Sequence, residues 1–265
     1  MADSPEYREK IAHFSKMLTT YGRKPALEAL QDTSLQCHTL HLADNNREGG
    51  IIAQLIEQAS RRQVEVRYHS RAELARISKN GKQDQGVALD IACPRFSALE
   101  DLARRFQTGK SLRLLAMDGI TNPANLGMII RSAAAGEIDG IIWSRRGNAA
   151  LGPLVIKASA GTLYKAPLVI CPELPAALKQ CRDHGASIAI LAADASQSLF
   201  DQRPTGHCVY VLGNESEGVS QAVRDMADTT LSIPMANGVE SLNVAVTASL
   251  IAYAGLLASQ PYLER

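Results

Sequence analysis

Residues 112–127 read Leu112-Arg-Leu-Leu-Ala-Met-Asp-Gly-Ile-Thr-Asn-Pro-Ala-Asn-Leu-Gly127, and this stretch decides the fold. It begins with a short apolar run, which is typical of a buried strand, and continues through a polar loop into an apolar helix. The same order recurs up to the C-terminus. We expect strands at Leu112–Met117, Gly140–Trp143, Leu168–Ile170, Ile188–Leu191, Val209–Leu212 and Leu231–Ile233. We expect helices at Leu126–Ala135, Gly152–Ala158, Leu174–His184, Ser220–Ala227 and Ser241–Leu257. This alternation predicts an α/β fold with a parallel sheet covered on both faces.

A smaller α/β unit is predicted ahead of this one. A helical pattern extends from Arg8 to Leu30 and is broken around Tyr21–Pro25. The patterns that follow predict strands at Cys37–Leu42, Val64–Tyr68 and Gly86–Ile91 and helices at Ile51–Arg62 and Arg71–Ile77. The mixed, charged segment after Cys93 has neither pattern. We therefore expect a domain over residues 1–95, a linker over residues 96–110 and a second domain over residues 111–265.

The composition excludes several classes of protein. With 46% hydrophobic and 21% charged residues among 265, the chain is unlike disordered, collagen-like or coiled-coil sequences. No apolar run reaches the roughly 18 residues that a membrane span requires, so we expect a cytoplasmic protein without a membrane partner. The five cysteines include no C-x-x-C pair and the six histidines show no ligand spacing. We therefore expect reduced, packing cysteines and no metal site.

The charge differs between the two parts of the chain. Residues 1–110 carry 17 Lys and Arg against 14 Asp and Glu, whereas residues 111–265 carry 11 against 13. Lys and Arg side chains that neutralise phosphates supply much of the affinity of proteins for nucleic acids. A polyanion would therefore suit the N-terminal part, although an ordinary solvated surface explains the same charges.

The loops that follow the predicted strands are the candidate sites, because ligands of open parallel sheets bind beyond the carboxyl ends of the strands. The first loop holds Asn122 and Asn125, which either bind a ligand or cap the next helix. Arg131 lies further along that helix among apolar residues. Because a guanidinium is rarely buried without a partner, Arg131 is a candidate functional residue.

Two further loops carry polar residues in unusual places. Residues 212–219 read Leu-Gly-Asn-Glu-Ser-Glu-Gly-Val, which matches neither the dinucleotide-binding G-x-G-x-x-G nor the P-loop. Glu217 there suits the start of the next helix, whereas Glu215 is a candidate site residue. In a third loop, Ser241 is either an N-cap or a site residue. Asn243, in the first turn of a buried helix, needs hydrogen-bond partners.

Together the three loops resemble the three motifs of the SpoU (TrmH) family, within the SPOUT superfamily of RNA methyltransferases. The matching segments are Asn122-Pro-Ala-Asn-Leu-Gly127 with Arg131, Leu212-Gly-Asn-Glu-Ser-Glu-Gly218, Ile233-Pro-Met235 and Ser241-Leu-Asn-Val244. Their order and separation also fit the family. Through Tyr21–Leu30 and Gln85–Val87, the N-terminal unit is similar to the family's substrate-binding domain, an α/β fold related to certain ribosomal proteins.

The resemblance implies properties that the residues alone do not show. The C-terminal domain would be tied into a deep trefoil knot, and the protein would be a homodimer. The cofactor would be S-adenosylmethionine, with Gly213, Ile233 and Leu242 at the matching contact positions and Met235 as a neighbour. These residue types suit an adenine ring, which needs apolar walls and main-chain hydrogen-bonding groups.

The implied reaction transfers a methyl group from the sulfonium of S-adenosylmethionine to a ribose 2′-hydroxyl in RNA. Arg131 matches the family's catalytic arginine, and it would act in its own protomer or on the cofactor of the partner. Since a guanidinium scarcely deprotonates, we expect Arg131 to bind the adjacent phosphate and stabilise the developing alkoxide, while the proton leaves to phosphate, water or a carboxylate. The residues assigned to positioning are Asn122, Glu215, Ser241 and Asn243, and Asn125 would shape the loop.

The N-terminal domain favours ribosomal RNA, 23S in particular, over transfer RNA as the substrate. Other interpretations stay open. A non-catalytic RNA-binding module of ribosome assembly would share the fold, and so would a methyltransferase directed at a base. A nucleotide-dependent oxidoreductase would fit the alternation of strands and helices, but its glycine fingerprint is absent from the sequence.

Overall fold

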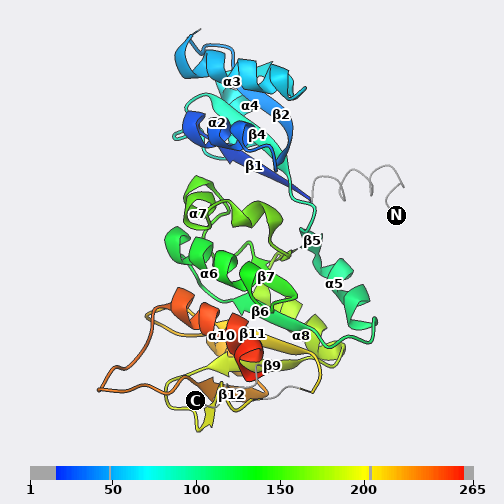
Figure 1. The fold of residues 1–265 in the computed structure, drawn as a ribbon, viewed down its shortest axis with the longest axis vertical. Helices are drawn as coiled ribbons and strands as arrows, with labels where there is room; N and C mark the ends of the chain where they lie inside the picture. Colours follow the sequence, from blue (N-terminus) through cyan, green and yellow to red (C-terminus); the bar gives the residue numbers. More distant parts are fainter. Residues whose placement is uncertain (1–15, 48, 203–204, 260–265) are drawn as a thin grey trace. The chain divides into compact units, whose positions relative to one another are not determined.

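The computed structural model describes residues 16–47, 49–202 and 205–259. The chain divides into two compact units (Figure 1). The first comprises Met1–Arg95 with Leu151–Ile156, and the second comprises Phe96–Ala150 with Lys157–Arg265.

The N-terminal unit is built on a four-stranded sheet in the order β1-β4-β2-β3. Strand β4 is antiparallel to both of its neighbours, whereas β2 and β3 are parallel. Its strands are β1 (Met17–Tyr21), β2 (Gln36–Ala43), β3 (Glu65–His69) and β4 (Val87–Ala92). Its helices are α2 (Arg23–Gln31), α3 (Gly50–Arg61) and α4 (Arg71–Ser78).

The start of this unit differs from the sequence prediction. Residues 17–21 form strand β1, not the end of a helix, and residues 8–15 of the predicted helix lie outside the described residues. In β1, Leu18 and Thr20 are buried, whereas Met17, Thr19 and Tyr21 are half-buried, which is the alternation of a strand. The chain then turns at Gly22, whose φ of 95° favours glycine, before α2 begins.

The second unit contains an eight-stranded sheet in which every pair of neighbouring strands is parallel, in the order β10-β12-β9-β11-β6-β7-β8-β5. The strands are β5 (Ser97–Ala98), β6 (Arg113–Met117), β7 (Gly140–Ser144), β8 (Leu168–Cys171), β9 (Ser187–Leu191), β10 (Gln197–Ser198), β11 (Cys208–Leu212) and β12 (Thr229–Ser232). Its helices are α5 (Leu99–Phe106), α6 (Pro123–Ala135), α8 (Leu174–Asp183), α9 (Gln221–Arg224) and α10 (Val244–Ser259), with a 3₁₀ turn, η1 (Thr162–Lys165). Helix α7 (Pro153–Ala158) begins in the segment Leu151–Ile156, which groups with the first unit, and ends in the second. The predicted parallel sheet is confirmed.

Both faces of this sheet are covered by helices. On one face, α5, α8 and α9 pack against alternate strand residues such as Leu114, Ile142 and Val211, all fully buried. Helices α6 and α10 pack against each other, and each also contacts the sheet. Ser249 of α10 donates a hydrogen bond to Ser132 of α6, at 2.8 Å. Strand β11 lies between β6 and β9, although it follows both in the chain. The trefoil knot stays a prediction.

Residues 96–110, expected to be a linker, form ordered structure in the second unit. Strand β5 pairs with β8, and α5 follows it directly. In α5, Leu102 and Phe106 are four residues apart and both are buried in the core. Between them, Arg104 is exposed, and Arg105 is half-buried and donates a hydrogen bond to the backbone oxygen of Asp139 at 2.9 Å. Because many residues of this segment are charged, the helical spacing of its few apolar residues did not stand out in the sequence.

The five cysteines are all free, and four of them are buried. Burial raises the pKa of Cys93 to about 12 and that of Cys171 to about 11. Buried thiols with such values carry little thiolate at neutral pH, so these residues act as apolar packing groups. Within the described residues, no helix combines the length and the apolar character that a membrane crossing requires.

The position of α5 gives a test of stability. Leu102→Ala is expected to lower the free energy of unfolding of the second unit by about 2–5 kcal/mol, because a fully buried side chain is lost. Arg104→Ala, exposed on the same helix, should change it by no more than about 0.5 kcal/mol. Urea unfolding can be followed by the fluorescence of Trp143 in β7, the only tryptophan in the chain. Equal midpoints for the two variants would contradict the packing of α5.

Candidate functional site

Three loops leave the carboxyl ends of β6, β11 and β12 and meet at one edge of the parallel sheet. In the first loop, Asn122 is the N-cap of α6: its side-chain oxygen accepts a hydrogen bond from the backbone N–H of Ala124 at 2.8 Å. Pro123 occupies the first position of the helix, where its missing N–H costs nothing. The capping role considered for Asn122 is therefore observed.

Asn125 connects all three loops by hydrogen bonds. Its side-chain N–H donates to the carboxylate of Glu215, and its oxygen accepts from the side-chain N–H of Asn243 at 3.2 Å. Asn125 is 7% exposed, so both partners satisfy a buried amide. The sequence assigned Asn125 only to shaping the loop. The signal for a larger role was an Asn on the buried face of a helix, beside Leu126.

Asn243 also begins α10. Its side-chain oxygen accepts a hydrogen bond from the backbone N–H of Ala245 at 2.8 Å, and the helix begins at Val244. Asn243 therefore precedes the first turn and does not lie within it. Ser241 is exposed and stands too far ahead of Val244 to be the N-cap that was considered for it.

The second loop is a tight turn closed by its own backbone. Asn214 and Gly218 exchange two backbone hydrogen bonds, each of 2.9 Å. The side chain of Asn214 accepts from the N–H of Ser216 at 2.9 Å, which holds the turn from inside. A Cβ atom on Gly213 would lie only 2.2 Å from the carbonyl carbon of Gly218. Only glycine allows this close approach.

Glu217 does not cap a helix, contrary to the expectation from the sequence. Helix α9 begins at Gln221, and Ser220 is its N-cap. Three residues separate Glu217 from that helix, so the helix dipole does not explain its position.

An apolar hollow opens between the second and third loops. Gly213, Ile233, Met235 and Leu242, the four residues predicted to contact a cofactor, all line it. Met235 and Leu242 are exposed, although both are large apolar side chains. The remaining lining residues are Leu191, Ala192, Ala193, Leu212, Asn214, Glu215, Gly218, Leu231, Glu240, Ser241, Val244 and Thr247.

Residues 191–193 also line this hollow, and nothing in the sequence pattern predicted their place there. Leu191 is the last residue of β9, and Ala192 and Ala193 follow it. Strand β9 lies beside both β11 and β12 in the sheet. The carboxyl end of β9 therefore opens on the same edge as the two loops. The strand order would have found these residues, but a sequence does not give that order.

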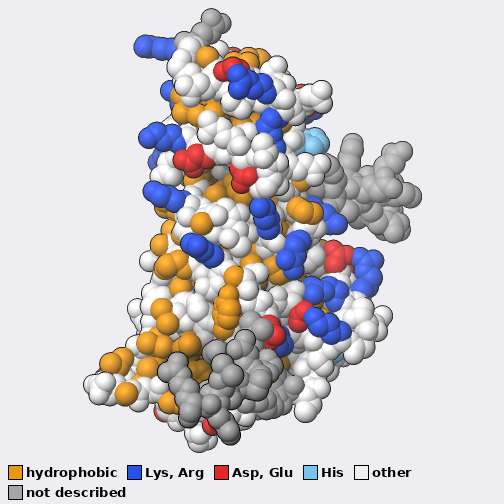
Figure 2. All heavy atoms as spheres, in the orientation of Figure 1, with side chains coloured by type: hydrophobic (Ala, Val, Ile, Leu, Met, Phe, Trp, Pro, Cys, Tyr) orange, Lys and Arg blue, Asp and Glu red, His pale blue; other side chains and the backbone are white. Residues whose placement is uncertain are grey.

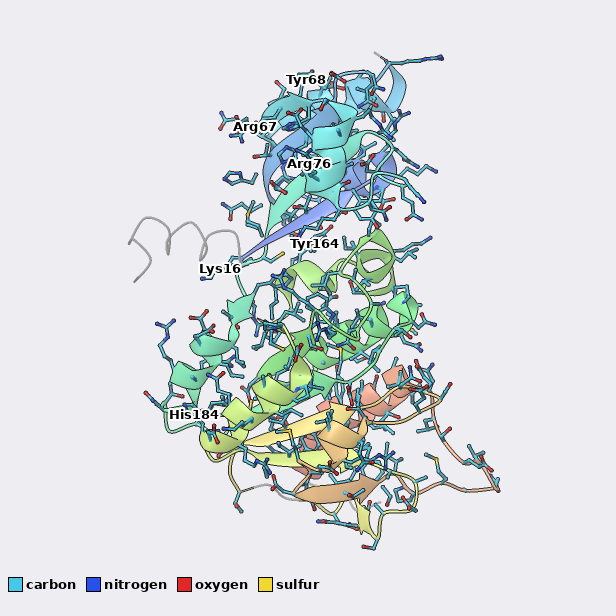
Figure 3. All side chains as sticks on the ribbon, turned by 180° about the vertical axis from the view of Figure 1, so that it is seen from behind. Lys16, Arg67, Tyr68, Arg76, Tyr164 and His184 are labelled. Carbon is cyan, nitrogen blue, oxygen red and sulfur yellow. The ribbon has the colours of Figure 1, made fainter. Side chains whose placement is uncertain are left out.

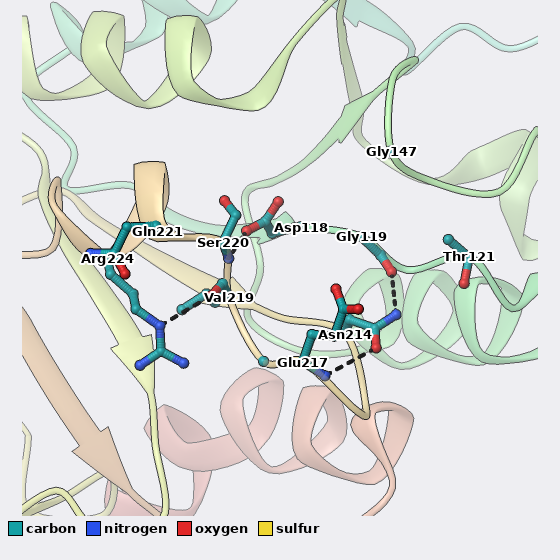
Figure 4. A pocket seen from close by; sticks show the side chains of 11 residues that line it. Asp118, Gly119, Thr121, Gly147, Asn214, Glu217, Val219, Ser220, Gln221 and Arg224 are labelled. Carbon is teal, nitrogen blue, oxygen red and sulfur yellow. Dashed lines mark hydrogen bonds between the residues drawn. The ribbon is translucent and has the colours of Figure 1, made fainter.

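A second, polar hollow of about 540 Å³ lies against the same turn (Figure 4). It shares Asn214 and Gly218 with the apolar hollow. Asp118 accepts a hydrogen bond from the N–H of Ser220 at 2.6 Å, and Arg224 donates to the backbone oxygen of Val219 at 3.1 Å. The rest of the lining comprises Gly119, Thr121, Gly147, Glu217 and Gln221.

Arg131 lies outside both hollows in this chain. It is exposed, and among the described residues it makes no hydrogen bond or ion pair. The expectation of a guanidinium held among apolar residues is therefore wrong for the single chain. Met128, on the same helix, is 41% exposed, and Val246 of α10 is 47% exposed. Arg131, Met128 and Val246 are thus exposed residues of two helices, α6 and α10, that pack against each other.

The comparisons with known proteins place this arrangement in a class of RNA-modifying enzymes. Residues 113–253 match the model of the SpoU rRNA methylase family. Residues 20–97 match the substrate-binding domain of RNA 2′-O-ribose methyltransferases. A protein of Mycolicibacterium vanbaalenii described as an uncharacterized tRNA/rRNA methyltransferase is 32% identical over 231 residues, which cover 87% of this chain and 73% of that protein.

Solved structures share the fold. The SpoU methyltransferase AviRb from Streptomyces viridochromogenes, crystallised with S-adenosylmethionine, superposes with a TM-score of 0.62 at 23% identity, covering 96% of this chain and 94% of that chain. An rRNA methyltransferase from Sinorhizobium meliloti, also with S-adenosylmethionine bound, gives 0.59 at 19% identity, covering 97% and 92%. The chain belongs to the SpoU family of RNA methyltransferases, as its three motifs predicted.

The close packing at Gly213 gives a test of the apolar hollow. Gly213→Ala is expected to displace the turn at residues 214–218, because the added methyl group has no room beside Gly218. Binding of S-adenosylmethionine, measured by calorimetry, should weaken at least about tenfold, or 1.4 kcal/mol. Gly206→Ala is the matched control, since nothing lies within 4 Å of a Cβ atom there. Unchanged binding by the Gly213 variant would contradict this use of the hollow.

Proposed function

We propose that the protein transfers a methyl group from S-adenosylmethionine to a ribose 2′-hydroxyl of RNA, and that ribosomal RNA is the substrate. The observation that carries the proposal is the hydrogen-bonded group Glu215–Asn125–Asn243, which joins the three motif loops beside an apolar hollow. The match of residues 20–97 to a ribose methyltransferase substrate-binding domain supports the choice of the ribose. Its presence ahead of the catalytic unit favours a large, folded RNA.

The residues of the apolar hollow fit S-adenosylmethionine. Leu231, Ile233 and Leu242 supply apolar walls for an adenine ring, and the turn at Gly213 brings backbone groups close to the hollow. When bound, this cofactor supplies a methyl group attached to a positively charged sulfur. Glu215 and Glu240 also line the hollow and place negative charge near that cation.

Arg131 acts on the RNA in this proposal. A guanidinium keeps its protons at any physiological pH, so Arg131 donates hydrogen bonds and does not serve as a base. It would bind the phosphate next to the target ribose and stabilise negative charge on the 2′-oxygen as the proton leaves. Glu215 and Asn243, both exposed and both bonded to Asn125, would hold the nucleotide in place, together with Asn122 and Ser241.

A homodimer would bring Arg131 to a cofactor. Within one chain this side chain does not line the apolar hollow. Met128, one turn before Arg131 on α6, is exposed, and so are Val246 and Tyr253 of α10, whose Tyr253 hydroxyl donates a hydrogen bond to the backbone oxygen of Ala135 in α6. Hydrophobic side chains are exposed on the face of the second unit drawn in Figure 2. Large apolar side chains exposed together mark a surface for protein association. A second copy docked on this surface would supply Arg131 to the hollow of its partner.

Methyl transfer from tritiated S-adenosylmethionine to total RNA from a strain lacking this gene tests the reaction. After nuclease digestion, a labelled 2′-O-methylated nucleoside is expected, and size fractionation of the RNA should place the label in ribosomal RNA. Label on a base would replace the proposal by a base-directed enzyme. No label, with the cofactor still bound, would favour a non-catalytic RNA-binding module.

Arg131→Ala is expected to lower the rate of methyl transfer by at least about 100-fold, because the charge that stabilises the 2′-oxygen is lost. Binding of S-adenosylmethionine should stay nearly unchanged, because Arg131 acts on the RNA in this proposal and is not among the residues that line the hollow of its own chain. Arg104→Ala, which removes an exposed arginine of α5, is the control and should keep full activity. Loss of cofactor binding with residual turnover would contradict this role of Arg131.

A mixture of variants tests whether Arg131 acts across a dimer. Arg131→Ala and Gly213→Ala chains are unfolded, mixed and refolded together. Activity is assayed at a concentration of S-adenosylmethionine that leaves the weakened Gly213→Ala hollow largely empty, so that each variant alone has little activity. If Arg131 serves the partner, each mixed dimer has one complete site out of two. Because random pairing of equal amounts makes half of the dimers mixed, about a quarter of the wild-type activity should return. If Arg131 serves its own chain, no mixed dimer has a complete site and the mixture stays inactive.

A further inference from the structure

A chain of hydrogen bonds runs across the sheet of the N-terminal unit, outside the site described above. Asp90 Oδ2 lies 3.0 Å from His41 Nε2, and His41 Nδ1 lies 2.9 Å from His69 Nε2. Thr19 donates a hydrogen bond of 2.6 Å to the other oxygen of Asp90. The four side chains come from the four different strands of the sheet. His41 is buried, whereas His69, at the end of the chain of hydrogen bonds, is partly exposed.

The register of the strands places this group on one face of the sheet. Thr19 stands opposite Asp90 in the pairing of β1 with β4, and His41 stands opposite Arg67 in the pairing of β2 with β3. Helix α4 covers another part of this face through Leu74. A histidine and a carboxylate are costly to bury, so such a set is expected only where hydrogen bonds compensate or a function requires it.

The hydrogen bonds determine which ring nitrogens carry protons. Burial by itself raises the pKa of Asp90, but the hydrogen bonds from His41 and Thr19 hold that pKa below its usual range, so Asp90 is a carboxylate that only accepts. His41 must therefore donate from Nε2. Neutral His41 then accepts at Nδ1, and His69 must donate from Nε2. This leaves His69 Nδ1 as the free lone pair, to which no described residue donates a hydrogen bond.

The charges around His69 oppose protonation in the free protein. Partial burial lowers the pKa of His69, and His41 lowers it further when its own ring is protonated; Arg67 adds to this effect, whereas Glu73 opposes it. The titratable and charged groups that face this end of the sheet are His38 and His41 on β2, Glu65 and Arg67 on β3, Asp90 on β4 and Glu73 on α4. An anion brought to Nδ1 would reverse the balance and favour the imidazolium.

We infer that the Asp90–His41–His69 chain makes His69 a proton-dependent ligand for an RNA phosphate. This inference rests on the proposed function, because it takes RNA as the molecule that the N-terminal unit binds. The match of residues 20–97 to a substrate-binding domain assigns RNA contact to this unit but to no residue within it.

Strand β3 has the character of an RNA-binding edge. It is the last strand of the sheet, with β2 as its single neighbour among the described residues. Arg67 and Tyr68 immediately precede His69 and both are exposed, Tyr68 to 62%. Figure 3 labels both side chains on this strand. An exposed arginine suits a phosphate, and an exposed aromatic ring on the other face of the same edge strand suits a base. Successive residues of a strand point to opposite faces, so Arg67 and His69 share the face that carries the hydrogen-bonded chain.

RNA binding is therefore coupled to proton uptake. Protonated His69 donates Nδ1–H to a phosphate oxygen, whereas neutral His69 presents a lone pair that repels it. The bound phosphate raises the pKa of His69, so affinity is highest below the pKa of the free protein and falls as the pH rises through the two values. A rise of one unit in this pKa corresponds to a change of about tenfold in affinity.

The experiment measures the affinity of the full chain for ribosomal RNA between about pH 5.5 and 8.5. Filter binding gives the affinity, and calorimetry in buffers of different ionisation enthalpy gives the number of protons taken up. Wild-type affinity should fall by about tenfold across this range. His69→Gln, which keeps a polar side chain but cannot titrate, should remove both this fall and the proton uptake. His184→Gln, in the second unit, is the control and should behave as wild type.

Asp90→Asn tests the chain as a positioning device. The negative charge of Asp90 stabilises the protonated form of His69 through the hydrogen bond of His41. Without that charge, the midpoint of the affinity profile should move to lower pH. A purely structural Asp90 would change the thermal stability and leave that midpoint in place. Identical pH profiles for the wild type and both variants would overturn the inference.

Methyl transfer in the same preparations separates the two proposals. If labelled methyl enters RNA while His69→Gln keeps the wild-type pH profile of binding, this inference fails and the proposed function stands. If no preparation transfers a methyl group but the pH profiles differ as expected, the proposed function fails and RNA contact by His69 stands. If RNA binds with no dependence on pH in the wild type, the inference is wrong regardless of activity.

Discussion

The parallel pairing of β6 with β11 is the constraint on which the site depends. It places Met117 opposite Leu212, so the loops that follow these two strands leave the sheet side by side. The buried amide of Asn125 can then reach Glu215 in the second loop and Asn243 ahead of α10. Residues separated by about a hundred positions in the chain meet because two strands share a register, and no local preference of the loops could bring them together.

Much of the fold could be predicted because its strands and helices have strong patterns. The strands β6, β7, β8, β9 and β11 are short apolar runs between helices, and a fully buried parallel strand requires that pattern. The prediction failed where the pattern was weak. Residues 17–21 lie within a stretch with helical spacing, but pairing with β4 outweighs that preference. In residues 99–106, two buried side chains decide the outcome among many charges.

The candidate site was predictable only in part, for a related reason. Gly213 and Asn243 could be singled out because a close backbone approach and a buried amide leave signals in the sequence. Ala192 and Ala193 line the hollow because of the order of the strands in the sheet, and a single sequence does not give that order. The exposure of Arg131 likewise depends on how α6 packs against α10. The apolar residues around Arg131 predict that the helix is buried, but they do not tell which side of it faces solvent.

The two units use buried polar groups in the same way. Asn125 and His41 are nearly inaccessible, and the two polar atoms of each side chain are both hydrogen-bonded to side chains that are more exposed. A buried amide or imidazole has few alternative partners, so it fixes the orientation of the groups it bonds. Those outer groups, Glu215 and Asn243 in one unit and His69 in the other, remain available to a ligand while their geometry is set from behind. Exposed polar side chains that are held rigidly from beneath suit the recognition of a flexible RNA substrate. Their conformational entropy is already lost on folding, so it is not lost again when the RNA binds.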